Sequence, residues 1–248
     1  MDARILMVPA AVLLAGYRAW RLQARGIGTS AALGLKLDVS SAVDVLGGVL
    51  LSTLSLFAVF LLEWNTGLLT VHGLGPVGSL VRDISTPVVV AFVEEFVFRS
   101  ALLGILLLWT GMPIAVTISA AAFAAVHLGN AGVNSLAIAS YFVGGVIYGL
   151  AFATTQGLWL PFGLHLGWNY AQGRLLGFAL SGGSVPNPFV LQHDNGPGVW
   201  TGGAYGLENG ILGLVARVIV GVLLFGWLYL GTNLTGRFTT PRGRERGE

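Results

Sequence analysis

Seven long apolar segments constrain the fold of this chain more than any other feature of its sequence. Each is bounded by polar or glycine-rich residues, and they cover residues 4–20, 43–62, 86–108, 112–129, 135–154, 158–180 and 208–231. Most have close to the ~20 residues that an α-helix needs to cross a bilayer. Transmembrane β-strands are about half as long and alternate in polarity. The sequence therefore predicts an all-α, polytopic transmembrane bundle of about seven spans, with eight as the alternative.

The composition agrees with a membrane protein and argues against other classes. Charged residues make up 10% of the chain, whereas soluble domains contain about 25%. The net charge is only +2, and basic residues gather at the ends of apolar segments, which indicates membrane orientation and no nucleic-acid partner. The absence of cysteine excludes a thiolate nucleophile. We expect one integral domain over residues 1–248, multi-pass, in the cell (plasma) membrane.

The first apolar segment resembles a signal peptide in length but not in charge. Its apolar core, residues 5–15, is as long as a signal-peptide h-region. However, Arg18, Arg21 and Arg25 follow this core, whereas the basic residues of a signal peptide precede it. We therefore expect residues 1–20 to be retained as a span.

Two connections between apolar segments are long. Residues 63–85 and 181–207 are rich in glycine or proline, which is the composition of loops. We predict that both are extramembrane loops or interfacial segments.

The third apolar segment contains two adjacent acids and a base, Glu94, Glu95 and Arg99. A carboxylate at the bilayer centre costs about 2.5–3.5 kcal/mol, so ionisable residues in a span predict a functional site. Glu95 and Arg99 are four residues apart, about 40° around a helix, and should form an ion pair. Glu94 points elsewhere and should face a polar intramembrane cavity. A purely structural salt bridge would explain Glu95 and Arg99 but would leave the cost of burying Glu94 uncompensated.

Two later apolar segments each contain a histidine with a partner one helical turn away. Phe123 precedes His127 by four residues, and Asn169 follows His165 by four, so each pair shares a helix face. A single histidine on an apolar face is more often a hydrogen-bonded core residue than a catalyst. Considered together with Glu94, however, the two histidines predict one polar site built from neighbouring helices.

The three motifs together resemble the signature of a known family. In chain order they are Glu94-Glu95-x-x-x-Arg99, Phe123-x-x-x-His127 and His165-x-x-x-Asn169. This ordered set is similar to that of the CPBP family, which comprises type II CAAX prenyl endopeptidases and bacteriocin-processing or immunity proteins. The resemblance covers residues 85–180, which it marks as the catalytic core, and no motif position departs from the family pattern.

The resemblance implies that the chain is an intramembrane endopeptidase. Its partner would be a protein or peptide substrate in or near the bilayer, of CAAX type or bacteriocin-like. By position, Glu94 and His127 would activate water, and His165 and Asn169 would stabilise the oxyanion. The supporting residues would be Glu95, Arg99 and Phe123.

Two mechanisms and two non-protease functions stay open from the sequence. In the preferred mechanism Glu94 is the base and no cofactor is needed. In the other, Glu94, His127 and His165 hold a divalent metal such as zinc, although the usual His-Glu-x-x-His helix is absent. The alternatives to a protease are a non-catalytic immunity or scaffold protein and a proton-coupled transporter. The second is disfavoured because Asn169 cannot titrate in a proton relay.

The apolar segments contain two glycine pairs and one further charge. Gly145-x-x-x-Gly149 and Gly163-x-x-x-Gly167 predict close helix packing. Arg217 lies nine residues after Glu208 inside the last segment. Two interpretations are open for this arginine: it reaches the interface with its long side chain, or it pairs with a carboxylate.

Overall fold

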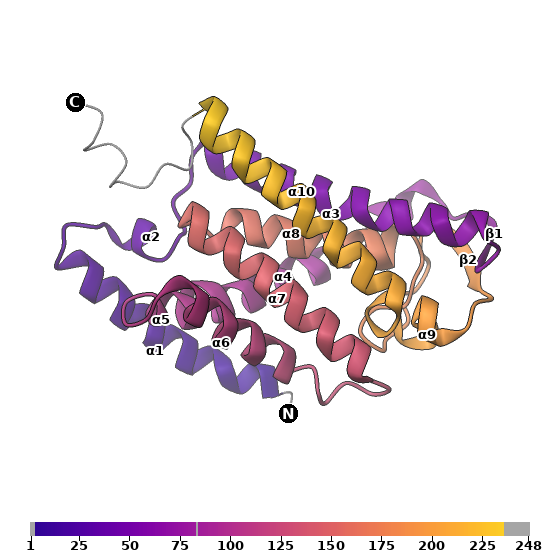
Figure 1. Cartoon of the computed structure of the whole chain (residues 1–248), viewed down its shortest axis with the longest axis horizontal. Helices are drawn as coiled ribbons and strands as arrows, with labels where there is room; N and C mark the ends of the chain where they lie inside the picture. Colours follow the sequence, from indigo (N-terminus) through magenta and orange to yellow (C-terminus); the bar gives the residue numbers. More distant parts are fainter. Residues whose placement is uncertain (1–2, 83, 236–248) are drawn as a thin grey trace.

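The computed structural model describes residues 3–82 and 84–235, and most of them are helical (Figure 1). The α-helices are α1 (Ala3–Gln23), α2 (Thr29–Ala32), α3 (Val39–Asn65), α4 (Ser85–Glu95), α5 (Gly104–Leu106), α6 (Met112–Ala125), α7 (Ser135–Thr155), α8 (Trp159–Asn169), α9 (Gly198–Thr201) and α10 (Ile211–Thr235). The 3₁₀ helices are η1 (Val77–Leu80), η4 (Gly203–Tyr205) and η5 (Leu207–Asn209). Two π-helical segments, η2 (Phe96–Leu103) and η3 (Tyr170–Leu175), directly continue α4 and α8.

Each predicted apolar segment coincides with a helix or with a continuous helical run. Among the described residues, three helices are long and apolar enough to cross a bilayer, over Val39–Asn65, Ser135–Thr155 and Ile211–Thr232. The prediction of an all-α helical membrane bundle is confirmed, whereas the number of spans stays a prediction.

The bundle is apolar outside and carries polar side chains inside. Leu46 on α3 and Phe225 on α10 are 70% and 71% exposed, and apolar surface of this kind is stable when lipid tails cover it. In contrast, Ser52, Ser119 and Ser140 are fully buried in the interior. In Figure 1, α3 and α10 lie together along one side, α1 and α6 lie along the other, and α7 and α8 pass between them.

Glycines allow α8 to lie directly against α3. A Cβ added at Gly167 would lie 2.7 Å from the Cα of Val49, and one added at Gly48 would lie 2.5 Å from the backbone nitrogen of Leu164. On α7, a Cβ at Gly145 would lie 2.8 Å from the Cα of an alanine in α6. Both predicted glycine pairs are therefore at close helix contacts. The contact between α8 and α3 sets the position of α8, the helix that carries His165.

We expect Gly167→Ala to lower the melting temperature of the purified protein in detergent micelles. The added methyl group meets the backbone of α3, which cannot move aside like a flexible side chain, and overpacking of this kind costs about 1–3 kcal/mol. The matched control is Gly226→Ala on α10, where an added Cβ has no atom within 4 Å. Equal melting temperatures for Gly167→Ala and the wild type would contradict the close contact.

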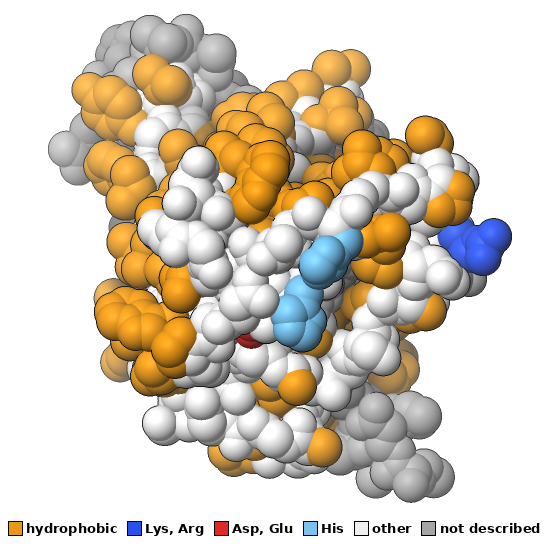
Figure 2. Space-filling view, turned by 90° about the vertical axis from the view of Figure 1, so that its right-hand side faces the viewer, with side chains coloured by type: hydrophobic (Ala, Val, Ile, Leu, Met, Phe, Trp, Pro, Cys, Tyr) orange, Lys and Arg blue, Asp and Glu red, His pale blue; other side chains and the backbone are white. Residues whose placement is uncertain are grey.

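The two long connections are more ordered than predicted. Strands β1 (Leu69–Leu74) and β2 (Val190–Asp194) form an antiparallel pair, with an irregularity between Val71 and Gly73. This pairing joins residues more than 100 positions apart, so neither local pattern could reveal it. The histidines of this sheet, His72 and His193, are exposed and have ring centroids 6.4 Å apart. Histidine side chains lie together on this face of the molecule (Figure 2).

The bounds of the two connections also need correction. Helix α3 continues to Asn65, so the first connection begins at Thr66, three residues later than predicted. The end of the second connection folds back into the bundle, where Thr201, Tyr205 and Leu207 are buried. This return brings the residues of the second connection to the polar cavity described below.

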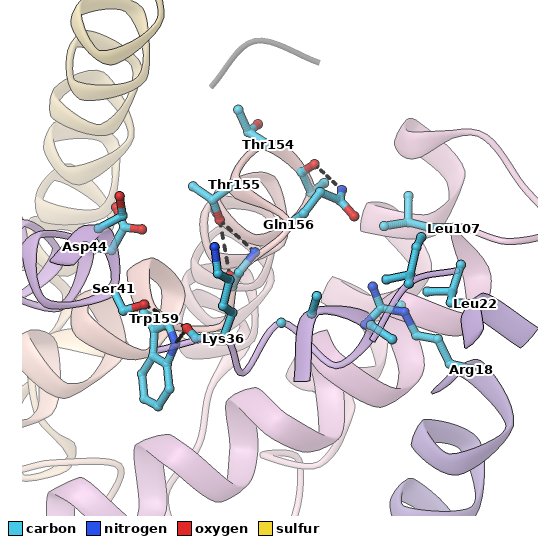
Figure 3. A pocket seen from close by; sticks show the side chains of 18 of the residues that line it. Arg18, Leu22, Lys36, Ser41, Asp44, Leu107, Thr154, Thr155, Gln156 and Trp159 are labelled. Carbon is cyan, nitrogen blue, oxygen red and sulfur yellow. Dashed lines mark hydrogen bonds between the residues drawn. The ribbon is translucent and has the colours of Figure 1, made fainter. Parts of the chain in front are cut away.

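A large cavity of about 800 Å³ lies where α1 and α2 meet the C-terminal end of α7 and the start of α8 (Figure 3). Its polar side chains include Arg18, Lys36 and Asp44, and Trp159 donates a hydrogen bond to the carbonyl of Lys36 at 2.7 Å. No predicted site residue lines this cavity. Cavity size therefore does not identify the functional site. The chemistry of the residues that line each cavity is the better criterion.

Candidate active site

The first and third motifs lie where an α-helix changes to a π-helix. Glu94 and Glu95 are the last two residues of α4, which continues as η2, and Asn169 is the last residue of α8, which continues as η3. His127 lies just past the end of α6 at Ala125. Such wide turns are rare and often occur at functional sites. All three motifs are thus carried by helix ends in the interior.

Glu95 lies at the centre of a buried ion-pair network. Its Oε2 is 3.0 Å from Nε of Arg99, as the spacing of four residues predicts, and both side chains are fully buried. Its Oε1 accepts a hydrogen bond from Nδ1 of His165 at 2.8 Å. The contact between Glu95 and His165 is a finding that the sequence did not indicate. Since an ionised carboxylate only accepts, this contact places a proton on Nδ1 of His165 and fixes the orientation of the ring.

Glu94 faces the opposite nitrogen of the same ring. Oε2 of Glu94 lies 3.9 Å from Nε2 of His165, and the Glu94 side chain is 9% exposed. This distance is too long for a direct hydrogen bond. The imidazole of His165 therefore lies between the two adjacent carboxylates, with Glu95 as its support and Glu94 on the cavity side.

His127 is oriented by its own helix. Nδ1 of His127 donates to the carbonyl of Phe123 at 2.8 Å, because a carbonyl can only accept. The ring stacks on Tyr141 with centroids 3.9 Å apart. Phe123 supports both histidines, with ring centroids 5.0 Å from His127 and 5.8 Å from His165. The guanidinium of Arg99 lies over the Phe123 ring at 4.7 Å, so Phe123 packs at the centre of the three motifs.

One cavity joins the predicted catalytic residues. It has a volume of about 130 Å³, which is room for a few water molecules of about 30 Å³ each. Its lining includes the four residues assigned from the motifs, namely Glu94, His127, His165 and Asn169. The expectation that Glu94 faces a polar cavity is therefore met, and the two histidines share that cavity with it.

Four further residues of the cavity lining were not predicted as site residues from the sequence. They are Tyr141, Ser181, Glu208 and Arg217. The Tyr141 hydroxyl lies 2.9 Å from the Ser181 hydroxyl, and Glu208 accepts hydrogen bonds from Gln172 at 2.6 Å and from Ser181 at 3.4 Å. Glu208 and Arg217 were visible in the sequence as unusual charges. However, nothing in the sequence indicated that they lie close to the three motifs. Nothing marked Tyr141 or Ser181.

A metal site at these residues is not supported by the part of the chain that the structure describes. Within residues 3–82 and 84–235, no group of three or more histidine, aspartate and glutamate side chains is arranged to hold one. The described residues therefore give no support for a site made by Glu94, His127 and His165, and the reaction proposed below uses no metal.

The fold and the cavity define a helical membrane protein with a buried carboxylate–imidazole site. Residues 76–171 match the model of a family described as type II CAAX prenyl endopeptidase Rce1-like. This segment belongs to the CPBP family of intramembrane proteases, as its three motifs predict, and it includes every motif position from Glu94 to Asn169. The match indicates a protease of the intramembrane CAAX type in an integral membrane protein. No curated protein and no solved structure matches the chain.

Proposed function

We propose that this chain is a multi-pass endopeptidase of the plasma membrane that hydrolyses a peptide bond in a membrane-associated protein or peptide of CAAX type. The observation that carries the proposal is the shared cavity, in which Glu94, His127, His165 and Asn169 meet. Hydrolysis needs a base beside water and fixed donors where negative charge develops. The cavity lining supplies both kinds of group.

In the proposed reaction Glu94 is the general base. It takes a proton from a water molecule whose position is set by His127, and the water oxygen attacks the carbonyl carbon of the scissile bond. The electron pair of the C=O bond moves to its oxygen. His165, carrying a proton on Nε2 as well as on Nδ1, and the Asn169 amide donate hydrogen bonds to this oxyanion. Glu94 then returns the proton to the amide nitrogen as the C–N bond breaks. The products are one new carboxyl terminus and one new amino terminus.

Glu95 and Arg99 would act by holding His165. The hydrogen bond from Nδ1 of His165 to Glu95 leaves Nε2 directed toward Glu94. Arg99 balances the charge of Glu95 in an interior that would otherwise disfavour it. Phe123 fills the space between the two histidine rings.

The test is cleavage of a library of membrane-inserted peptides by purified wild-type protein and by Glu94→Gln in the same vesicles. Mass spectrometry would identify new termini that the wild type makes and the variant does not. Equal cleavage by both proteins would remove the catalytic assignment and favour the non-catalytic immunity or scaffold alternative.

We expect the wild type to keep its cleavage rate after treatment with a strong chelator and removal of the complex. The base in the proposed reaction is a carboxylate, so the rate should not depend on a divalent ion. Total metal in the treated sample, measured by mass spectrometry, is the control for complete removal. Loss of activity that zinc restores would contradict this expectation and would assign Glu94, His127 and His165 as ligands.

A further inference from the structure

Arg217 on α10 is a buried cation in the wall of the catalytic cavity. It is only 3% exposed and lies outside the segment that matches the family, residues 76–171. Of the two interpretations open from the sequence, extension to the interface is wrong, because the side chain is buried in the bundle.

The contacts of Arg217 are with neutral aromatic side chains. Nη1 donates to the Tyr148 hydroxyl at 2.6 Å, and Cζ lies 3.4 Å from the centre of the Trp168 ring. Among the residues that the structure describes, no carboxylate forms an ion pair with it. Pairing with a carboxylate therefore holds only at longer range, where the charge of Glu208 acts on Arg217 across the cavity without a direct contact. The nearby acid Glu208 receives its hydrogen bonds from Gln172 and Ser181 instead.

A glycine on the neighbouring helix α7 leaves room for the guanidinium of Arg217. A Cβ added at Gly144 on α7 would lie 2.9 Å from Cζ of Arg217, so this glycine permits the position of the charge. Trp168 lies on the same helix as His165 and Asn169, and Arg217 lines the same cavity as these two donors. A buried cation without a directly bonded anion is costly, and Glu208 acts on Arg217 only through its charge at longer range. A function that uses an anion in the cavity explains why it is kept there.

We propose that Arg217 binds the oxyanion of the tetrahedral intermediate, as a third donor beside His165 and Asn169. This inference rests on the proposed function. The planar guanidinium of Arg217 offers N–H donors and a positive charge at the point where the carbonyl oxygen becomes negative. Because the charge appears only after attack by water, Arg217 stabilises the intermediate more than the bound substrate.

The first test is steady-state kinetics of Arg217→Gln on a peptide that the wild type cleaves. Loss of one oxyanion donor lowers kcat by about 10²- to 10³-fold, and we expect this fall with little change in KM. Arg217→Lys, which keeps the charge, should recover part of the loss.

The matched control for these kinetics is Arg18→Gln. Arg18 is also 3% exposed, donates to the carbonyl of Ser100 at 3.2 Å and lies over the Phe152 ring. It lines the large cavity of Figure 3, not the catalytic one. Arg18→Gln should therefore match Arg217→Gln in thermal stability but keep kcat. Equal losses of kcat in both variants would mean that burial alone explains Arg217.

The second test needs no turnover. A peptide with a phosphinate in place of the scissile amide carries a tetrahedral anion, and its binding can be measured by calorimetry in micelles. Arg217→Gln should weaken phosphinate binding by about the factor lost in kcat/KM, and substrate-peptide binding much less. Gly144→Ala, which displaces the guanidinium but keeps its charge, should also weaken it. Gly221→Ala is its control, because an added Cβ there makes only ordinary contacts, the nearest at 3.7 Å.

The outcomes separate this inference from the proposed function. If wild-type cleavage depends on Glu94 but Arg217→Gln cleaves as the wild type does, the inference is wrong and the function stands. If cleavage does not depend on Glu94, the function is wrong, and phosphinate binding decides the inference alone. The inference about Arg217 is overturned if the wild type does not bind the phosphinate peptide. It is also overturned if Arg217→Gln binds this peptide as tightly as the wild type.

Discussion

Glu94→Gln is expected to lower the rate of peptide cleavage by about 10²- to 10⁴-fold, the range for loss of a general base. The amide has the size of the carboxyl group but cannot take a proton from water. Glu94 is not the partner of Arg99, whose ion pair is with Glu95. The fold should therefore persist, and the melting temperature should stay near that of the wild type. The measurement is the initial rate on a peptide identified from the library.

The control for this prediction is Glu63→Gln. Glu63 is a fully buried carboxylate near the end of α3 and does not line the catalytic cavity. Its replacement makes the same change of a buried carboxyl group to an amide without touching the motifs. We expect Glu63→Gln to cleave at the wild-type rate. Equal losses in both variants would show that loss of any buried carboxyl group, and not of a base at Glu94, lowers activity.

Arg99→Met is expected to destabilise the protein by about 3–5 kcal/mol, the usual cost of breaking a buried ion pair from one side. Both side chains of the pair are fully buried, so Glu95 would be left as a charge in the interior. Methionine keeps much of the volume beside Phe123, so a cavity is not the main cause. Thermal unfolding in micelles measures the effect, and an unchanged melting temperature would contradict it.

The double variant Glu95→Gln with Arg99→Met separates charge from packing. Replacing a buried ion pair with neutral residues is often neutral for stability, so we expect this variant to recover most of the melting temperature. Cleavage should stay low, because His165 loses the carboxylate that orients its ring. Full recovery of cleavage would show that Glu95 and Arg99 serve the fold alone.

The sequence predicted the parts of the site that depend on helix geometry. The ion pair of Glu95 and Arg99 follows from their spacing on one helix. The placement of Glu94 in a cavity follows from the cost of burying a second carboxylate. The close helix packing at Gly167 follows from the small-residue pattern, although the pattern did not indicate α3 as the partner. Each of these depends on one helix face or on one energetic cost, which a single sequence can reveal.

The remaining features depend on contacts between distant segments. The hydrogen bond from His165 to Glu95 crosses between α8 and α4, and no local pattern indicates which acid a histidine will meet. The wall with Ser181 and Glu208 exists because the second long connection folds back into the bundle. Arg217 was visible as an unusual charge, but its contact with Trp168 depends on how α10 packs. The pairing of β1 with β2 could not be predicted either, because it too joins segments that are far apart in the sequence.

The most direct test of the central claim is cleavage in water enriched in oxygen-18. Purified wild-type protein in vesicles should place one heavy oxygen in each new carboxyl terminus, because the attacking oxygen comes from water held in the cavity with Glu94. Glu94→Gln should produce almost no labelled terminus in the same time. Labelled termini formed at equal rates by both proteins would contradict the account, since water would then be activated by some other group.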